Sequence, residues 1–479
     1  MKFFNLAVPT ILAFLMIPIV ISCDDDFLVR SPMDAIAEDA YYNSPDRAIA
    51  AINAVYNTLG SADLYEDWMV RILEVPSDDI HLARSTGLEF NTYSFTAADV
   101  ILTRVYGGLY EGVYRANVVL ERVPGIEGMD ASLEQRIIGE AKFLRALFYH
   151  HLTAFWGEVP LITQVPGSPD DVLIAKSPVS DIYNVMVADL EEAAELLPVT
   201  QDDPGRATRY AAMTLLGKVH LYNENYAAAE EWLGRVIDSG EYELLEDFQQ
   251  IIHVDNPNHA ESIFELQFDN PPPSGVGTRR ANWNLVQPVG AGHQMVREDI
   301  VNAFEEGDPR LFYSVYRDGD DFCPTCDEQF HTFDSSLSAT GYAIKKGMYP
   351  GRRGQNMDIN QPILRYADVL LMYAEAANEL DMLDEARDAL NQVRQRPSVD
   401  MPSRTVADTG NRQDMFEAIV HERRVELAFE HQRFFDLRRW GLGEEYLGEL
   451  GYEETRHRWF PLPQNEVDTN PELVQIPGW

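Results

Sequence analysis

Apolar residues recur at helical spacing in pairs of segments, and a short polar turn separates the two members of each pair. One pair covers Thr208–Tyr222 and Ala227–Ile237, and another covers Tyr366–Leu380 and Leu383–Val393. Small residues such as Gly217 stand where the two helices of a pair would meet. Because a single pair cannot bury its apolar faces alone, we expect the pairs to stack into a curved array with an extended surface.

Four further segments have the spacing of amphipathic helices: Pro45–Leu59, Leu102–Val123, Leu133–Phe155 and Asp181–Leu197. For the last of them, Ser180 is the expected N-cap and Pro198 ends the helix. The order of small and aromatic residues in the pair that begins at Thr208 resembles a tetratricopeptide unit. The sequence therefore predicts a mainly α fold, with tetratricopeptide-like helix pairs in an α-α superhelix.

The helical pattern stops between residues 249 and 364. This stretch contains three consecutive prolines at 271–273, many glycines, one well-formed helix near Arg297–Phe304 and one good strand candidate, Ile263–Phe268. We expect a loop-rich, minor-β region laid over the helices, and binding residues concentrate on such loops. The chain then divides into an N-terminal helical part, 45–248, and a C-terminal part, 249–479, in which the loop-rich region 249–364 precedes closing helices over 365–440.

The first residues have the pattern of an export signal. An apolar run that two prolines interrupt follows a single lysine and stops at Ser22 and Cys23, before three aspartates. This arrangement predicts a signal peptide over 1–22 rather than a membrane span. The Ser22-Cys23 pair resembles a bacterial lipobox, so we expect acylation of Cys23, a lipidated tether over 23–44 and attachment to a membrane without crossing it.

The balance of charges restricts the partners. Acidic residues outnumber basic residues by 78 to 38, which gives a formal net charge of −40. Such a charge repels polyanions, so nucleic acid is effectively excluded as a partner and direct contact with an anionic membrane surface is disfavoured.

Apart from Cys23, the chain contains only Cys323 and Cys326, in the stretch DGDDFCPTCDE. In an exported chain we expect a disulfide between them, since a zinc site would need two more soft ligands. The acidic residues around the pair are weak candidates for a calcium site, against the simpler interpretation of a hydrated acidic loop: Asp318, Asp320, Asp321 and Asp327. We expect no other cofactor.

Two clusters near helices invite a catalytic or metal-binding interpretation. Glu422, Glu426 and Glu430 stand four apart, and arginines follow them. Paired carboxylates suit acid–base catalysis, but arginine-rich surroundings keep carboxylates ionised, so we favour an ion-pair network that locks the last helix to the array. His150 and His151 are adjacent on a helix and point about 100° apart, which disfavours a shared metal ion.

Several strings resemble the SusD/RagB family of outer-membrane lipoproteins, and they occur in order along the chain. They are EAKFLRALFYHHLTAFWGEVPL from Glu140, DIYNVMVADLEEAAELLP from Asp181, GRATRYAAMTLLGKVHLY from Gly205, DPRL from Asp308, ILRYADVLLMYAEAANEL from Ile363, ERRVELAFEHQRFFDLRRWG from Glu422 and FPLPQNEVDTNPELVQIPGW from Phe460. The resemblance implies a helical protein with four tetratricopeptide-like pairs. It also implies a lid on a SusC-like TonB-dependent transporter, outside the cell, that binds a glycan or, in some branches, a peptide.

Sugar sites combine aromatic rings, which stack on pyranose faces, with polar side chains that bind hydroxyls. The resemblance places such sites on the loops before Leu102–Val123 and on the irregular region. The candidates there are Trp68, Asp78, Asp79, His81, Tyr93 and Phe95 from the first loop, and Arg279, Asn282, Trp283 and Asn284 from the second. Asn282, Trp283 and Asn284 form the best single candidate, because a stacking ring lies between two amides.

Three functions remain open at this point. The first is a glycan-binding surface lipoprotein that performs no chemistry. The second is a peptide-binding lid on the same fold, for which an acidic chain would favour cationic peptides. The third is a surface hydrolase, although no nucleophile elbow, phosphate-binding loop, H-E-x-x-H or dinucleotide motif occurs.

Overall fold

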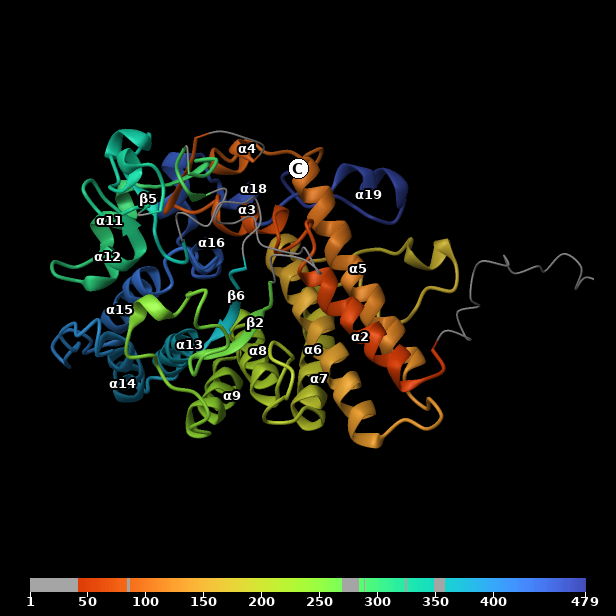
Figure 1. The fold of residues 1–479 in the computed structure, drawn as a ribbon. Coiled ribbons are helices and arrows are strands. Elements are labelled where there is room, and N and C mark those ends of the chain that lie inside the picture. Colours follow the sequence, from red (N-terminus) through yellow and green to blue (C-terminus); the bar gives the residue numbers. More distant parts are fainter. Residues whose placement is uncertain (1–41, 84–86, 269–283, 288, 324, 349–357) are drawn as a thin grey trace, which may run out of the picture.

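Helices that follow one another in the chain pack side by side in the computed structural model, which describes residues 42–83, 87–268, 284–287, 289–323, 325–348 and 358–479. Helix α5 packs on α6, α6 on α7, α7 on α8, α8 on α9, α9 on α13, and α13 on α14. Figure 1 shows this series along the lower part of the molecule, with α11, α12 and β5 above one end of it. The predicted stack of helix pairs is therefore confirmed.

The helices have the following bounds: α2 Pro45–Leu59, α3 Trp68–Glu74, α4 Leu88–Asn91, α5 Val100–Arg122, α6 Ala131–Trp156, α7 Val179–Leu196, α8 Arg209–Tyr222, α9 Tyr226–Asp238, α11 Glu298–Ala303, α12 Pro309–Ser314, α13 Tyr366–Glu379, α14 Leu383–Arg394, α15 Arg412–Glu426, α16 Arg433–Arg439, α17 Gly443–Leu447, α18 Glu454–His457 and α19 Gln464–Thr469. None of the helices in the described ranges is both long and apolar enough to cross a membrane.

Local sequence explains why the pair α8 and α9 forms. The side chain of Thr208 accepts a hydrogen bond from the backbone N–H of Ala211 and so caps α8. Asn223 ends α8, and Glu224 takes a positive φ of 58° in the turn. At the crossing, a Cβ on Gly217 would lie 2.6 Å from Leu233 of α9, so only glycine permits this approach. The small residue expected at the pair contact is thus required there.

A second close approach joins α5 to α6. A Cβ on Gly112 would lie 2.3 Å from the ring of Phe148, which is fully buried. Close-packed interiors absorb such an extra atom only by shifting neighbours. Gly112 therefore sets the distance between these two long helices.

Replacing Gly112 with alanine is expected to lower the free energy of unfolding by about 1–2 kcal/mol, because a clash of about 1–3 kcal/mol exceeds the gain in helix propensity of about 1 kcal/mol. Gly107 in the same helix is the matched control, since its added Cβ would have no neighbour within 4 Å. Gly107→Ala should therefore be neutral or stabilising. Urea denaturation of both variants checks this, and equal midpoints would contradict the close packing.

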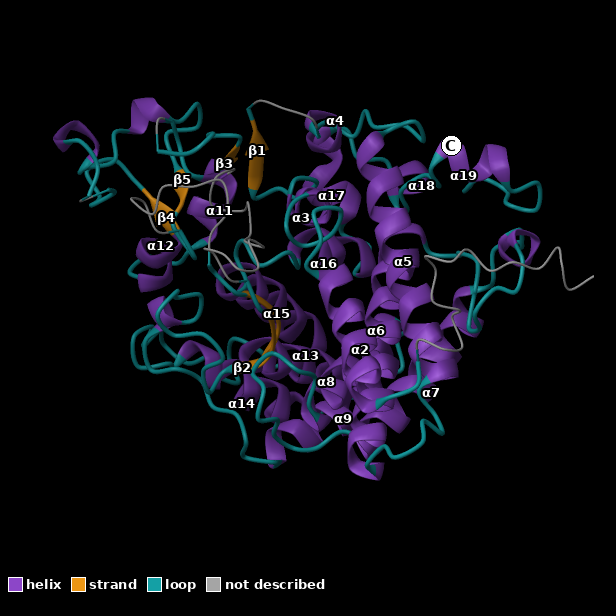
Figure 2. Ribbon diagram, turned by 45° about the vertical axis from the view of Figure 1, so that its right-hand side comes forward, coloured by secondary structure: helices purple, strands orange, loops and turns teal. Residues whose placement is uncertain are grey.

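Three short antiparallel ladders support the irregular region above the helices. They join β1 (Ile80–Leu82) to β3 (Gln294–Val296), β2 (Ser262–Leu266) to β6 (Gln361–Arg365), and β4 (Val315–Tyr316) to β5 (Ala343–Ile344). Figure 2 shows these strands as small isolated pairs rather than one sheet. The loop-rich, minor-β region expected from the sequence is confirmed, with its strand candidate shifted by one or two residues.

One local prediction was wrong. Ser180 does not cap α7, because that helix begins at Val179, two residues before the predicted start at Asp181, and Pro178 occupies the N-cap. The closing helices include a sharp turn of the chain. Helix α15 ends at Glu426, and two residues with positive φ, Phe429 at 62° and His431 at 67°, turn the chain before α16 begins.

Candidate functional site

The two loop regions that the sequence marked as binding candidates meet at one strand ladder. In it, His81 of β1 stands opposite Met295 of β3 (Figure 2). The pairing extends beyond the strands, because the Ala83 N–H donates to the His293 carbonyl and the Arg297 N–H donates to the Asp79 carbonyl, each over 2.9 Å. We call the surface around this ladder the β1–β3 face.

Asn91 fixes the ladder from behind. Its amide nitrogen donates to the carbonyls of Val75 at 3.0 Å and Ile80 at 2.9 Å, and its amide oxygen accepts from the Leu82 N–H at 3.2 Å. The guanidinium of Arg297 reaches the same oxygen and also donates to the Ile80 carbonyl. A buried amide with every bond made holds its surroundings in one arrangement.

Asp78 and Asp79 do not line a ligand site, which corrects the sequence prediction for both. Two nitrogens of Arg433 donate to Asp78 at 2.9 Å each, and Arg424 donates to Asp79 at 2.8 and 3.0 Å. Burial opposes ionisation of Asp78, but Arg433 and Arg424 outweigh it and hold the pKa of that carboxyl below its usual range. These aspartates tie the first loop to α15 and α16.

Tyr93 and Phe95 are also unavailable to a sugar, because both rings are buried among other rings. Phe95 is fully buried and stacks on Phe90 with centroids 4.8 Å apart, and its other neighbours are Phe460 at 5.2 Å and Trp479 at 5.1 Å. The Tyr93 hydroxyl donates to the carbonyl of Pro76. Tyr93 and Phe95 are thus aromatic because they pack against rings of the C-terminal segment.

Trp68 and His81 remain partly exposed, and they lie in different surroundings. Arg71 and Arg104 lie over the Trp68 ring, 4.3 and 5.2 Å from its centroid, which places Trp68 against α5 rather than on the β1–β3 face. Burial and the charge of Arg297 lower the pKa of His81, so its imidazole is neutral near pH 7. A neutral imidazole can both donate to and accept from a hydroxyl.

Asn284 is the candidate with an unmet bonding capacity. It is 1% exposed, and neither its amide nitrogen nor its amide oxygen has a hydrogen-bond partner among the residues that the structure describes. A buried amide without partners costs about 1–3 kcal/mol. Its neighbours Arg279, Asn282 and Trp283 lie outside the described residues, as does Cys23, so these predictions stay predictions.

Cys323 and Cys326 form a disulfide in the structure. The acidic residues nearby hold their own loop. Asp318 accepts from the Ser335 N–H and Asp320 from the Arg317 N–H, both at 2.9 Å. Asp321 pairs with Thr332 in a β-bridge, and the Asp327 carbonyl accepts from the Phe330 N–H. The carboxylates of Asp318 and Asp320 thus already accept hydrogen bonds from backbone N–H groups. A calcium site in this loop remains a prediction.

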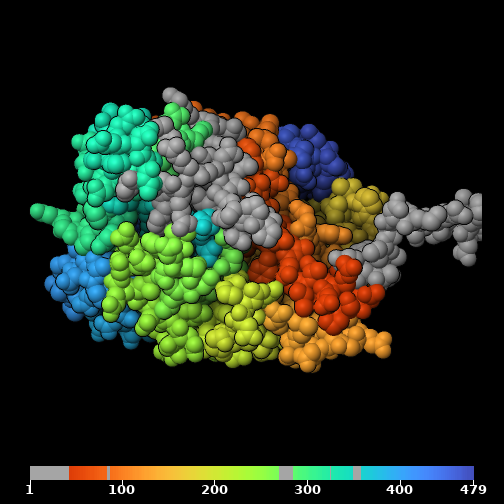
Figure 3. Space-filling model, viewed as in Figure 1, coloured from red at the N-terminus to blue at the C-terminus, as the bar shows by residue number. Residues whose placement is uncertain are grey.

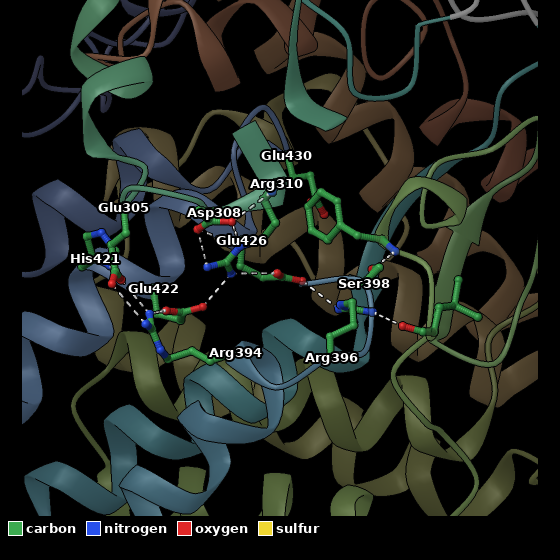
Figure 4. A network of polar contacts seen from close by, with 12 residues as sticks. Glu305, Asp308, Arg310, Arg394, Arg396, Ser398, His421, Glu422, Glu426 and Glu430 are labelled. Atoms are coloured by element: carbon green, nitrogen blue, oxygen red, sulfur yellow. Dashed lines mark hydrogen bonds and ion pairs between the residues drawn. The ribbon is translucent and has the colours of Figure 1, made fainter. Parts of the chain in front are cut away.

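The three glutamates four apart belong to a buried ion network, as predicted, although their partners differ from the arginines expected. Arg310 bonds to Asp308, Glu422 and Glu426, and Arg394 joins Glu422 to Glu305 (Figure 4).

The network continues beyond these residues. Arg365 and Arg396 link Glu426 to Glu261, and Lys346 pairs with Glu430. Burial disfavours the charged form of Glu426, but Arg396, Arg365 and Arg310 outweigh it and hold the pKa of that carboxyl well below its usual range. A general acid needs the opposite shift.

Two other clusters are equally unsuited to metal or acid–base chemistry. In the described part of the chain, Glu305, His421 and Glu422 form the one group whose ligand atoms are close enough for a metal, and Arg394 already pairs with both glutamates. His150 and His151 are buried on α6, where the Tyr65 hydroxyl contacts His151 at 3.0 Å. Neither cluster offers an open coordination site.

A groove along α5 was not predicted from the sequence. Three tyrosines that stand four apart, Tyr106, Tyr110 and Tyr114, line it together with the loop after α6 and the C-terminal segment, and its volume is about 300 Å³. Their regular spacing was visible in the sequence. On a helix such spacing usually indicates core packing. The groove could not be predicted from it, because its other walls come from segments distant in the chain.

A stack of helix pairs under a cap of irregular loops is the architecture of a helical-repeat protein, and the carboxylates described above are fixed in ion pairs. Comparison with known proteins gives the family. Residues 252–458 match the family model described as the SusD family, and residues 39–221 match one described as "Starch-binding associating with outer membrane". The chain belongs to the SusD family.

Relatives match along nearly the whole chain. A SusD-like protein, P25, from Formosa agariphila is 25% identical over 95% of this chain and 95% of its own. The crystal structure of a SusD-like protein from Bacteroides fragilis has a TM-score of 0.82 at 26% identity and covers 94% of this chain and 100% of that one. A laminarin binding SusD-like protein has a TM-score of 0.77 at 27% identity, over 91% and 99%.

Proposed function

We propose that this protein is a cell-surface lipoprotein that binds an oligo- or polysaccharide and delivers it to a SusC-like TonB-dependent transporter for import. The observation that carries the proposal is the match to a laminarin binding SusD-like protein over 91% of this chain and 99% of that one. The protein performs no chemistry in this proposal. The main alternative is a peptide-binding lid on the same kind of transporter.

The amino-terminal sequence supports the location. Cleavage before Cys23 and acylation of its sulfur and new N-terminus would anchor the protein in the outer membrane, facing outward, and residues 23–44 would act as a tether. The family model over residues 39–221 is described as associating with the outer membrane. Two or more acyl chains hold a protein stably where one does not.

The chemistry of the described residues supports a neutral, hydroxyl-rich ligand on the loop side of the molecule. Trp68 offers a partly exposed ring beside α5, and His81 offers a neutral imidazole on the β1–β3 face. The amide of Asn284 has both hydrogen-bonding atoms unpaired among the described residues. Rings and amides are the groups with which proteins bind pyranose sugars.

Replacing Trp68 with alanine is expected to weaken binding of the preferred oligosaccharide by about tenfold, since a stacked ring contributes about 1–1.5 kcal/mol. Calorimetry of the mature protein against laminarin, starch and xylan oligosaccharides measures this. Trp232→Ala is the matched control, because Trp232 is also partly buried and has a guanidinium, that of Arg235, 4.3 Å from its ring, but it lies on α9.

Other outcomes would select a different function. Binding to peptides and to no glycan would favour the peptide-binding alternative. Turnover of a glycan that disappears when one carboxylate is changed would establish a hydrolase.

A further inference from the structure

The tyrosines of the groove on α5 descend from the surface into the protein. Tyr114 is 46% exposed, Tyr110 is partly buried and Tyr106 is 4% exposed. The rings of Tyr106 and Tyr110 lie 4.8 Å apart at 47°. Gly107 also lines the groove and has no side chain to cover the helix backbone there. A Cβ at this position would meet nothing within 4 Å, so the groove is open above it. The three rings thus form a stepped aromatic floor along two turns of helix.

The two inner rings of the floor, Tyr106 and Tyr110, are held in place by their contacts. The Tyr110 hydroxyl donates to the Pro160 carbonyl at 2.7 Å. Tyr106 meets the ring of Trp156 edge-on at 5.1 Å, and the indole N–H of Trp156 donates to the Pro461 carbonyl at 2.9 Å. Rings that are fixed before binding lose little side-chain entropy when a ligand stacks on them.

Two segments from elsewhere in the chain wall the groove. One is the loop after α6, which includes a short 3-10 helix, Pro169–Val172, and the other is the C-terminal segment with α19. The side-chain amide of Asn470 donates to the Ile174 carbonyl at 2.9 Å and so joins the walls at one end. Figure 3 shows both segments adjoining on the side of the molecule where α5 lies.

The lining also carries an exposed apolar side chain and a single charge. Val172 is 38% exposed and lines the groove together with Tyr114, so it adds apolar surface to the wall. Glu466 is the one charged residue among the described residues of the lining. A carboxylate repels acidic ligands and accepts hydrogen bonds from hydroxyl groups.

We propose that this groove is a second binding site, for a neutral oligosaccharide, separate from the β1–β3 face. Pyranose rings have apolar faces that would lie on Tyr110 and Tyr114, and hydroxyl groups that would reach Glu466. A volume of about 300 Å³ is at the small end of the range for ligand sites, so the groove would hold a short part of a chain. The carboxylate of Glu466 disfavours uronate-rich glycans in the groove.

This inference rests on the proposed function and extends it. A glycan that contacts both the groove and the loops gains affinity by multivalency, without either contact being strong. A long polysaccharide would then bind more tightly than a short oligosaccharide of the same sugar.

The test fills the groove without disturbing the fold. Gly107→Leu places a side chain over the floor at a position where leucine favours the helix and an added Cβ meets no neighbour. Gly448→Leu is its matched control, because Gly448 is exposed, has a helical φ of −59° and also has no neighbour within 4 Å. Tyr114→Ala removes the outer ring, and Phe312→Ala, at a site 48% exposed outside the groove, is its control.

Laminarin and starch oligosaccharides serve as neutral probes and alginate oligosaccharides as acidic ones, measured by calorimetry on the full mature chain. Gly107→Leu and Tyr114→Ala are each expected to weaken binding of the tightest neutral probe by about tenfold, and the two controls to change it less than twofold. Glu466→Gln is expected to raise alginate binding by about threefold. Hydrogen exchange should show that the neutral probe protects residues 104–114 and 160–173.

Each contrary result has a distinct meaning. Unchanged affinity and exchange in Gly107→Leu, together with loss of binding in Trp68→Ala, overturns the second site and leaves the proposed function intact. A wild-type protein that binds no glycan at all overturns both. Protection of the groove by a peptide, but by no sugar, also overturns the second site.

Discussion

Replacing Glu426 with glutamine is expected to lower the free energy of unfolding by about 3–5 kcal/mol, which is a large part of the stability of an ordinary domain. Glu426 is fully buried. One of its oxygens accepts from Arg365 and Arg396 at 2.9 Å each, and the other accepts from Arg310 at 3.2 Å. The side chains of Arg310, Arg365 and Arg396 are also 0–2% exposed, so water cannot replace the lost charge beside them.

The cost arises because the partners stay charged. Burial disfavours the charged form of Arg310, but the neighbouring carboxylates outweigh it and keep the pKa of that guanidinium above its usual value. A neutral amide of the same shape would leave three buried cations with one fewer anion, and its NH₂ group would face a guanidinium. Removing one member of a buried pair costs far more than the pair itself contributes.

Urea denaturation followed by circular dichroism measures the effect. Glu231→Gln is the matched control, because Glu231 pairs with Arg235 on the surface, with side chains 59% and 49% exposed. That change should alter stability by less than about 0.5 kcal/mol. Equal midpoints for the two variants would show that water reaches the network in solution.

The parts of the fold that were predicted from the sequence are those that local patterns determine. Helical spacing and the small residue Gly217 gave the pairs of helices, since each signal acts within a few residues of itself. The spacing of Glu422, Glu426 and Glu430 also predicted an ion-pair network, but with the arginines that follow them in the chain as partners. Their actual partners include Arg310 and Arg365, which other elements supply.

The candidate site was less predictable, because burial there depends on distant segments. Asp78 looked like a free carboxylate in a loop, yet its partner Arg433 is 355 residues away. Phe95 looked like a stacking ring, yet Phe460 and Trp479 cover it. The structure brings the two loop regions together at the β1–β3 ladder, and which side chains stay open there depends on contacts that no local pattern encodes.

Lowering the pH from 6.5 to 4.5 is expected to destabilise the protein through two buried histidines of α6. Burial lowers the pKa of His151 to about 3, with Lys218 and His431 adding to the effect, and burial, His151 and Lys218 lower the pKa of His150. In the unfolded chain both imidazoles bind a proton near pH 6.5. Between these values the unfolded state holds more protons, so stability falls as the pH falls.

The size of the effect for His151 is about 1.4 kcal/mol per pH unit, or about 2–3 kcal/mol over this range, and His150 acts in the same direction. Burial raises the pKa of Asp79 and Asp99 to about 6, so these two carboxyls offset part of the loss. Carboxylates with lowered pKa, such as Asp436, add to the loss only below about pH 4.5, where the unfolded chain begins to bind protons at those groups.

His150→Phe isolates the contribution of one histidine, because phenylalanine keeps a ring against Tyr222, whose centroid is 4.9 Å from that of His150, and cannot bind a proton. Unfolding midpoints measured at intervals of 0.5 pH units should fall less steeply in this variant than in the wild type below pH 6.5. His331→Phe, at an exposed position, is the control and should leave the slope unchanged. If His150→Phe and the wild type lose stability in parallel, the imidazole of His150 is charged in the folded protein, which requires water or an anion beside it between α6 and α8.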